Sequence, residues 1–156
     1  MNPTPVRCLV LACGNTLRSD DGVGPWLAEW AEQRFRNEPG VRVLARQQWT
    51  PDLAEDVAHA GAVLFLDCSI AATPGELRLA PVEPAQNDAE AGTHHLGAAE
   101  LLALSRELYA TLPRAAMLLT IGAGSTELGE RFSDAVAAAL PAAQRRIEET
   151  VQRLIG

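Results

Sequence analysis

The sequence contains few cysteines and no pairing pattern among them. Cys8, Cys13 and Cys68 are an odd number, form no CxxC motif, and lie in or beside apolar runs. Thiols in such places are typical of buried, reduced cysteines in a reducing compartment. We therefore expect neither a cysteine nucleophile nor a zinc site.

The chain also lacks a block of basic residues and a long apolar segment. Acidic residues outnumber basic ones by 20 to 13, which gives a net charge of -7, whereas nucleic-acid binding depends on clustered Lys and Arg. The first apolar run, residues 8–13, is too short for a secretory or transmembrane segment, and the residues before it are polar. These features predict a cytoplasmic protein that binds neither nucleic acid nor membrane.

Fingerprints of nucleotide and acyl-enzyme chemistry are missing as well. The loop after the first apolar run does not match G-x-G-x-x-G, and two consecutive aspartates stand where a pyrophosphate would bind. Neither a G-x-x-x-x-G-K-[ST] loop nor a G-x-S-x-G elbow is present. A hydrolase of this composition would activate water through carboxylate, imidazole or metal.

The 156 residues do contain a regular alternation of apolar runs and amphipathic segments. We expect strands over 6–13, 41–45, 62–66 and 115–121, the first and third of them buried, and a half-exposed antiparallel strand over 76–79, where polar and apolar residues alternate. This pattern predicts a single domain, residues 1–156, of the α/β class. It has three layers: a mostly parallel twisted sheet of about five strands with an antiparallel edge strand, and helices on both faces.

Four helices are expected between these strands, the second of them opening with a Thr50 cap. Pro141 should kink or divide the last helix, and residues 81–92 are interpreted as a mobile loop. Apolar residues at helical spacing predict the inner faces of the first, third and last helices: Val23, Leu27, Trp30 and Ala31, with Trp26 extending the stripe; Leu101, Leu104, Leu108 and Leu112; Val136, Leu140, Ile147, Val151 and Leu154.

Polar residues stand at or near three strand ends. Asp20 and Asp21 follow the first strand, Asp67 ends the third, and His94 and His95 precede the third helix. Ligands of open α/β sheets bind beyond the carboxyl ends of the strands. Two carboxylates and an imidazole there could hold a divalent transition metal, or could form a general acid–base group.

Each of these residues also has a purely structural interpretation. One of the paired aspartates could cap the first helix, and Asp67 could accept backbone hydrogen bonds from a neighbouring loop. Thr93 could cap the third helix, with one of the adjacent imidazoles solvated. His59 is expected to be exposed on a helix end, and Trp26 and Trp30 to belong to the core or its rim.

Taken together, four segments resemble the hydrogenase maturation proteases, the endopeptidases that trim the C-terminus of the nickel-iron hydrogenase large subunit. The segments are the loop 14–24, GNTLRSDDGVG; the strand end 64–67, LFLD; the helix start 94–97, HHLG; and the stretch 129–136, GERFSDAV. The sequence departs from the family pattern in having Asp21 where Glu is frequent and Ala12 where Gly is usual.

The resemblance implies that Asp21, Asp67 and His94 surround nickel and form the catalytic site. The nickel would belong to the hydrogenase large-subunit precursor, so the enzyme would cleave a correctly metallated substrate, using water activated by the metal or by a carboxylate. Supporting positions in the loop would be Gly14, Asn15, Gly22 and Gly24, with Asp20 at the start of the helix. We expect a monomer.

Two other functions remain open from the sequence. A non-catalytic assembly chaperone would grip the nickel centre of the large subunit with the same residues and release no peptide. A small-molecule α/β enzyme would use the same crevice, although the chain carries no cofactor fingerprint.

Overall fold

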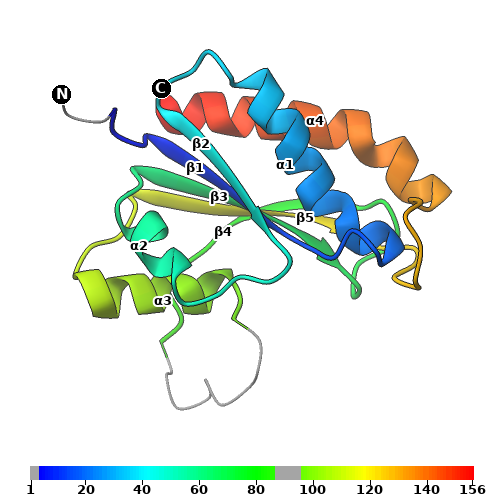
Figure 1. The fold of residues 1–156 in the computed structure, drawn as a ribbon, viewed down its shortest axis with the longest axis horizontal. Coiled ribbons are helices and arrows are strands. Elements are labelled where there is room, and N and C mark those ends of the chain that lie inside the picture. Colours follow the sequence, from blue (N-terminus) through cyan, green and yellow to red (C-terminus); the bar gives the residue numbers. More distant parts are fainter. Residues whose placement is uncertain (1–3, 87–95) are drawn as a thin grey trace.

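The computed structural model describes residues 4–86 and 96–156. Strands and helices alternate along the chain (Figure 1). Their bounds are β1 Cys8–Cys13, a short 3-10 helix Ser19–Gly22, α1 Val23–Arg34, β2 Val41–Arg46, α2 Leu53–Ala58, β3 Ala62–Ser69, β4 Leu77–Pro81, α3 Ala98–Tyr109, β5 Ala115–Gly122 and α4 Asp134–Ile155.

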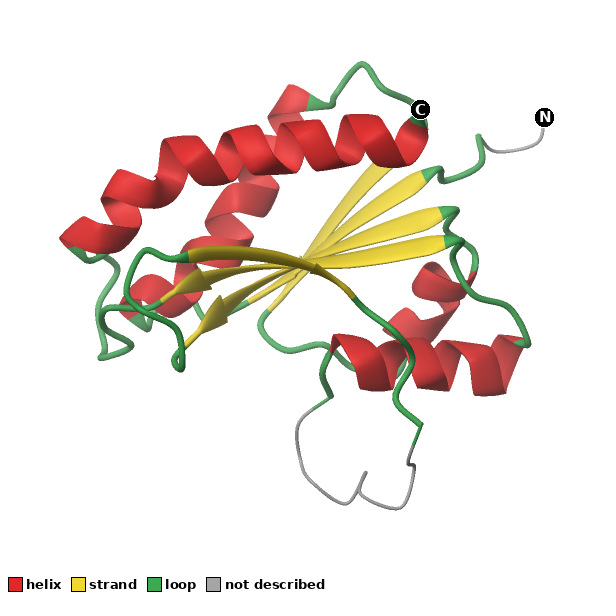
Figure 2. Ribbon diagram, turned by 180° about the vertical axis from the view of Figure 1, so that it is seen from behind, coloured by secondary structure: helices red, strands yellow, loops and turns green. Residues whose placement is uncertain are grey.

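In the described ranges the strands form one five-stranded sheet of order β2-β1-β3-β5-β4. The first four strands of this order are parallel, and β4 pairs antiparallel with β5 at the edge. Helices α1 and α4 cover one face and α2 and α3 the other (Figures 1 and 2). The predicted three-layer α/β fold with an antiparallel edge strand is confirmed.

The apolar runs form strands because they are covered on both faces. All six residues of β1 are buried, and successive side chains point to opposite sides of the sheet. Val10 and Ala12 pack with α1 and α4, whereas Leu9 and Leu11 pack with α2 and α3. This continuous burial makes the central strands a rigid base for the loops that follow them.

The inner face of α3 was predicted only in part. Leu101 is buried, but Leu108 is 58% exposed, and the helix ends at Tyr109 before it reaches Leu112. The buried polar residue Ser105 donates its hydroxyl to the carbonyls of Ala54 and Leu101. Because α2 spans only residues 53–58, it covers α3 near Ser105 and leaves the last turn of α3 exposed.

Of two further predictions for the helices, the cap of α2 was wrong and the effect of Pro141 on the last helix agrees with one of the two outcomes expected. Thr50 does not cap α2, because its hydroxyl donates to the Asp52 carboxylate. Pro141 lies inside α4 without dividing it, and the first turns of α4 are inclined to the rest of the helix (Figures 1 and 2). The predicted buried face of α4 is confirmed at Val136, Ile147 and Val151.

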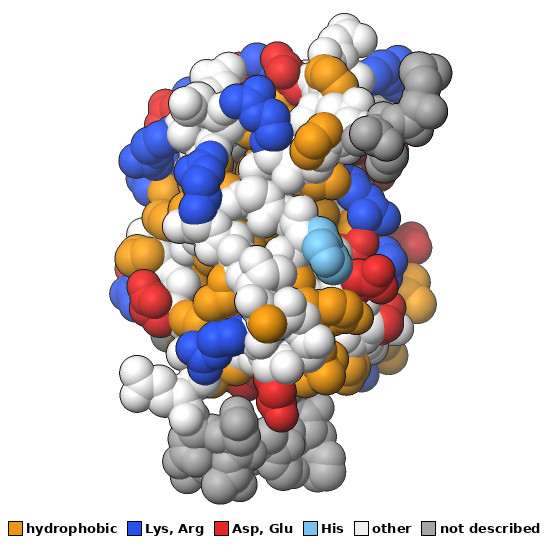
Figure 3. Space-filling model, turned by 90° about the vertical axis from the view of Figure 1, so that its left-hand side faces the viewer, with side chains coloured by type: hydrophobic (Ala, Val, Ile, Leu, Met, Phe, Trp, Pro, Cys, Tyr) orange, Lys and Arg blue, Asp and Glu red, His pale blue; other side chains and the backbone are white. Residues whose placement is uncertain are grey.

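The amino ends of the parallel strands lie at the side of the molecule opposite the β1–α1 loop (Figure 1). Figure 3 shows this side, where Arg and hydrophobic side chains intermix. Among the described residues no helix is both long and apolar enough to cross a bilayer. Of the predicted 81–92 loop, Pro81 is the last residue of β4, residues 82–86 form no helix or strand, and residues 87–92 lie outside the described residues.

Candidate functional site

The loop after β1 is shaped by close backbone contacts. Gly14 has φ +152, a conformation that L side chains rarely adopt, and a Cβ there would lie 1.9 Å from the carbonyl oxygen of Asp21. At Gly24 a Cβ would lie 2.5 Å from the carbonyl oxygen of Cys13. These two glycines let the loop fold back against the end of β1 and the start of α1.

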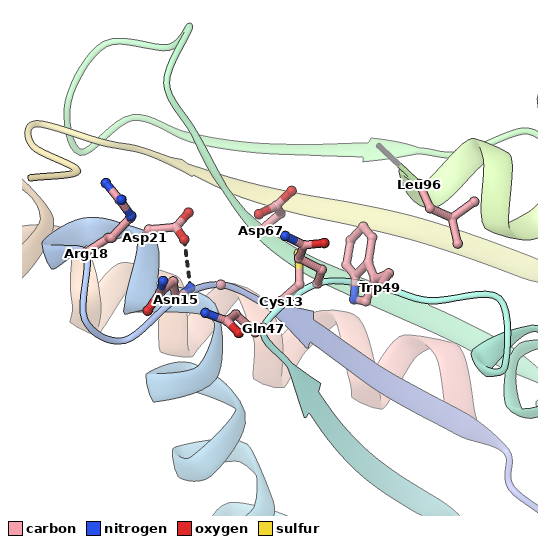
Figure 4. Close-up of a pocket in the computed structure, with 10 residues that line it drawn as sticks. Cys13, Asn15, Arg18, Asp21, Gln47, Trp49, Asp67 and Leu96 are labelled. Carbon is pink, nitrogen blue, oxygen red and sulfur yellow. Dashed lines mark hydrogen bonds between the residues drawn. The ribbon is translucent and has the colours of Figure 1, made fainter. Parts of the chain in front are cut away.

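Asp21 is held by the loop in which it lies. Its Oδ2 accepts a hydrogen bond of 2.7 Å from the backbone N–H of Asn15 (Figure 4). The side-chain oxygen of Asn15 accepts one of 2.9 Å from the backbone N–H of Leu17. One oxygen of the half-buried carboxylate therefore fixes the side chain, while the group as a whole borders a cavity.

Asp67 lies within β3, two residues before the strand ends at Ser69, and is not its last residue as predicted. The difference arises because β3 has two neighbours: it pairs with β1 only as far as Leu66 but continues with β5 through Ser69. Asp67 thus stands one residue beyond the last pair of the β1–β3 ladder, Ala12 and Leu66. Its Oδ1 accepts a 2.7 Å hydrogen bond from the Cys68 amide.

The structure brings Asp21 and Asp67 to one cavity at the carboxyl edge of the sheet. The cavity has a volume of about 270 Å³, and both carboxylates point into the same region (Figure 4). The other residues that line it come from the end of β1, the β1–α1 loop, the β2–α2 loop and the segment before α3: Cys13, Gly14, Asn15, Arg18, Gln47, Gln48, Trp49 and Leu96.

His94, the third predicted ligand, lies outside the described residues, as do Thr93 and His95. Leu96, two positions after His94, lines the cavity. Within 4–86 and 96–156, no three His, Cys, Asp or Glu side chains are grouped as metal ligands. The described part of the predicted site is therefore its two carboxylates, and its imidazole stays a prediction.

The cysteines near the site are poor nucleophiles. Burial raises the pKa of the Cys13 thiol, and the neighbouring carboxylate of Asp67, to which the thiol is hydrogen-bonded, raises it further. Burial and then the negative charges of Asp21 and Asp67 raise the pKa of Cys68 to about 12. Because the thiolate is the reactive form, these groups remain protonated thiols near neutral pH.

Asp20 has a different role from the predicted cap of the first helix. It is fully buried, and no side chain caps the start of α1. Its carboxylate accepts hydrogen bonds from the amides of Gly124 (2.7 Å), Ser125 (3.0 Å) and Ser133 (2.8 Å), and from the Ser133 hydroxyl (2.7 Å). Burial favours the protonated form, but these donors outweigh it and lower the pKa of Asp20.

Asp20 is the centre of a junction between two distant loops. Ser19, which has φ 51, donates its amide to the Gly129 carbonyl (2.7 Å), and the Gly129 amide donates to the Leu17 carbonyl (2.9 Å). The Asp20 amide donates to the Ser125 carbonyl (3.0 Å). The β5–α4 loop thus positions the loop that carries Asp21. Gly129 and Ser133, which make these contacts, belong to the 129–136 segment that carries part of the family resemblance.

Trp49 and the two glutamines before it were missed at the sequence level. Trp49 is 5% exposed and packs edge-on against Phe65, with ring centroids 5.1 Å apart. Its buried Nε1 has no hydrogen-bond partner in the structure as described. Their position directly after β2 could have indicated that they belong to the site. Strand β2 is parallel to β1 and β3, so the carboxyl ends of all three strands lie at the same edge of the sheet.

The remaining residues considered from the sequence lie away from the cavity. His59 is exposed and contacts the Glu55 carbonyl and the Tyr109 ring. Trp26 is 40% exposed and stacks edge-on against Phe132. Trp30 is half-buried against the core, as predicted for a core or rim residue.

Solved structures with the same fold cover nearly the whole chain. The hydrogenase maturating endopeptidase HybD from E. coli is 20% identical, with a TM-score of 0.74 over 94% of this chain and 93% of that one. At 26% identity, the hydrogenase 2 maturation peptidase of a Thaumarchaeota archaeon (TM-score 0.69) covers 94% of this chain and 98% of its own.

The [NiFe] hydrogenase maturation protease HybD from Thermococcus kodakarensis is also 26% identical, with a TM-score of 0.68 over 92% of this chain and 98% of that one. No family model and no curated protein sequence matches the chain.

Proposed function

This chain belongs to the hydrogenase maturation protease family, and from that premise we propose that it removes the C-terminal extension of a nickel-iron hydrogenase large-subunit precursor. In this proposal cleavage follows nickel insertion, and the enzyme recognises the inserted nickel. The observation that carries the proposal is the meeting of the Asp21 and Asp67 carboxylates in one cavity, the first from the segment between β1 and α1 and the second from β3.

Nickel arrives with the precursor and is therefore part of the substrate. Asp21 and Asp67, joined by His94, would supply oxygen and nitrogen ligands, a set suited to a divalent transition metal. Three ligands from the enzyme leave positions for groups of the precursor. The bound ion would supply Lewis acidity beside the scissile bond.

The carboxylates also have the chemistry for an aspartyl-type hydrolysis. One of them would accept a proton from water as its oxygen adds to the scissile carbonyl, and the proton would pass to the nitrogen as the C–N bond breaks. Asp21 has the fixed orientation that this role needs, because the Asn15 amide holds its Oδ2. Asp67 would then face the ion, or the two roles would be reversed.

The cavity supports a peptide substrate better than a nucleotide. Two carboxylates line it, which disfavours a phosphate, and Arg18 is the cation that borders it among the described residues. Gln47, Gln48 and the Trp49 indole add hydrogen-bonding groups that suit the amides of a polypeptide. We further propose that the protein acts as a monomer in the cytoplasm, with the precursor as its partner.

The decisive experiment compares nickel-loaded and nickel-free precursor. The proposal expects a C-terminal peptide, identified by mass spectrometry, to be released from the loaded form alone. Equal release from both forms would contradict nickel recognition. Binding of the loaded precursor without release, under conditions in which a cell extract processes it, would favour the assembly chaperone instead.

A further inference from the structure

Strand β2 presents an open row of backbone groups along one edge of the sheet. It pairs only with β1 in the described structure. The Cys8 amide donates to the Gly40 carbonyl (3.1 Å), and the Gly14 amide donates to the Arg46 carbonyl (3.1 Å). In a parallel ladder the residues between these two alternate in direction, so residues 42 and 44 face β1, while Val43 and Ala45 direct their N–H and C=O outward.

No backbone group elsewhere in residues 4–86 or 96–156 pairs with Val43 or Ala45. The Ala45 carbonyl accepts a side-chain hydrogen bond of 3.0 Å from Nη1 of Arg46. Ala45 is exposed, and Val43 is half-buried beside the core. A hollow of about 350 Å³ between α1 and β2 lies along the same edge, bordered by Phe35, Arg36 and Val43 among others. The edge therefore offers both backbone partners and space for side chains.

This edge leads directly into the candidate site. Gln47, Gln48 and Trp49 follow the last residue of β2 and line the cavity that holds Asp21 and Asp67. The bond from Gly14 to Arg46 fixes the end of β2 against the loop that carries Asp21. A peptide lying along β2 would thus be guided toward the carboxylates without leaving the extended conformation.

The opposite edge does not lead into the candidate site. Strand β4 ends in Pro81, which has no N–H to offer. It is also separated from β3, and so from Asp67, by the whole of β5. Of the two edges, β2 is the one that is continuous with the cavity.

We infer that the open edge of β2 binds the extended segment of the precursor next to the scissile bond as an added strand. Main-chain hydrogen bonds to Val43 and Ala45 would supply affinity, and alternate side chains would enter the hollow beside α1, as in other β-augmented complexes. The inference rests on the proposed function, because it takes the peptide substrate from it.

The test measures processing kinetics of nickel-loaded precursor by Ala45→Pro and Ala45→Ser. Proline deletes the outward N–H, at a position where an edge strand tolerates it, whereas serine keeps the N–H at the same exposed site. We expect Ala45→Pro to raise KM about fivefold, the usual effect of one lost hydrogen bond, with kcat within about twofold of wild type. Ala45→Ser should match wild type.

A second variant distinguishes a lost hydrogen bond from a folding defect in Ala45→Pro. Incorporation of lactic acid in place of Ala45 changes one amide into an ester and deletes the same N–H with little change of shape. A raised KM in this variant, with unchanged thermal unfolding, supports the added strand. An unchanged KM in this variant overturns it. If wild type releases no peptide, the proposed function itself fails, which is a separate result.

Discussion

The carboxylate of Asp20 accepts two hydrogen bonds from Ser133, one from the amide at 2.8 Å and one from the hydroxyl at 2.7 Å, across 113 positions of sequence. Ser133 is also the N-cap residue of α4 and accepts a bond from the Val136 amide. The start of α4 and the loop that carries Asp21 are therefore held by one buried charge.

Removal of this charge should destabilise the whole domain. Asp20→Ala would remove four charge-assisted hydrogen bonds from the donors of Gly124, Ser125 and Ser133, at a cost of about 3 kcal/mol in free energy of unfolding. Ser133→Ala removes one donor and the cap, and should cost about 1–2 kcal/mol. Urea unfolding measures both. Additive losses in the double variant would contradict a shared network.

The same carboxylate predicts how stability depends on pH. Because the pKa of Asp20 is lowered in the folded protein, the unfolded chain takes up its proton first as pH falls. The stability that Asp20 contributes is thus complete above the unfolded pKa of about 3.9 and is lost as pH falls through the lower native pKa. Urea unfolding of wild type and Asp20→Asn should therefore differ most near neutral pH and converge in acid. A constant difference would refute this linkage.

Asp21 and Asp67 should be needed for processing and dispensable for folding. An asparagine at position 21 keeps an oxygen that can accept from the Asn15 amide, so Asp21→Asn should fold normally. Without the second carboxylate charge, precursor processing should fall about 100-fold or more in either Asp21→Asn or Asp67→Asn. Glu29→Gln, on the exposed side of α1, is the matched control. Circular dichroism distinguishes a lost site from a lost fold.

The shape of the loop should matter as much as its charges. In Gly14→Ala, the new Cβ would meet backbone of Asp21, which no side-chain movement can relieve, at an unfavourable φ. We expect a loss of stability of about 2 kcal/mol or more, with processing strongly reduced. In Gly40→Ala the atoms nearest to the Cβ would be those of the flexible Arg7 side chain, and processing should continue. Equal effects of the two substitutions would argue against a specific role of Gly14.

Local sequence patterns were sufficient to predict the sheet and the position of the two carboxylates. The short continuous apolar runs of β1 and β3, bounded by turn residues, favour buried strands, and parallel strands bring their carboxyl ends to one edge. The role of Asp20 could not be predicted from the local sequence, because its hydrogen-bond partners, Gly124 to Ser133, lie 104 to 113 positions later in the chain. Leu108 was misplaced for a similar reason: its spacing fits a buried face, but its exposure depends on where α2 ends.

The cysteines provide a test that is independent of the substrate. Burial raises the pKa of Cys8 and of Cys68 to about 12 and raises that of Cys13 as well. Few thiolates should therefore exist at about pH 8, so iodoacetamide should label the folded protein far more slowly than the same protein in concentrated urea. Mass spectrometry of timed samples counts the labels on each thiol. Rapid labelling of Cys13 in the folded state would mean that the cavity activates this thiol, and the two-carboxylate chemistry would then have a competing nucleophile beside it.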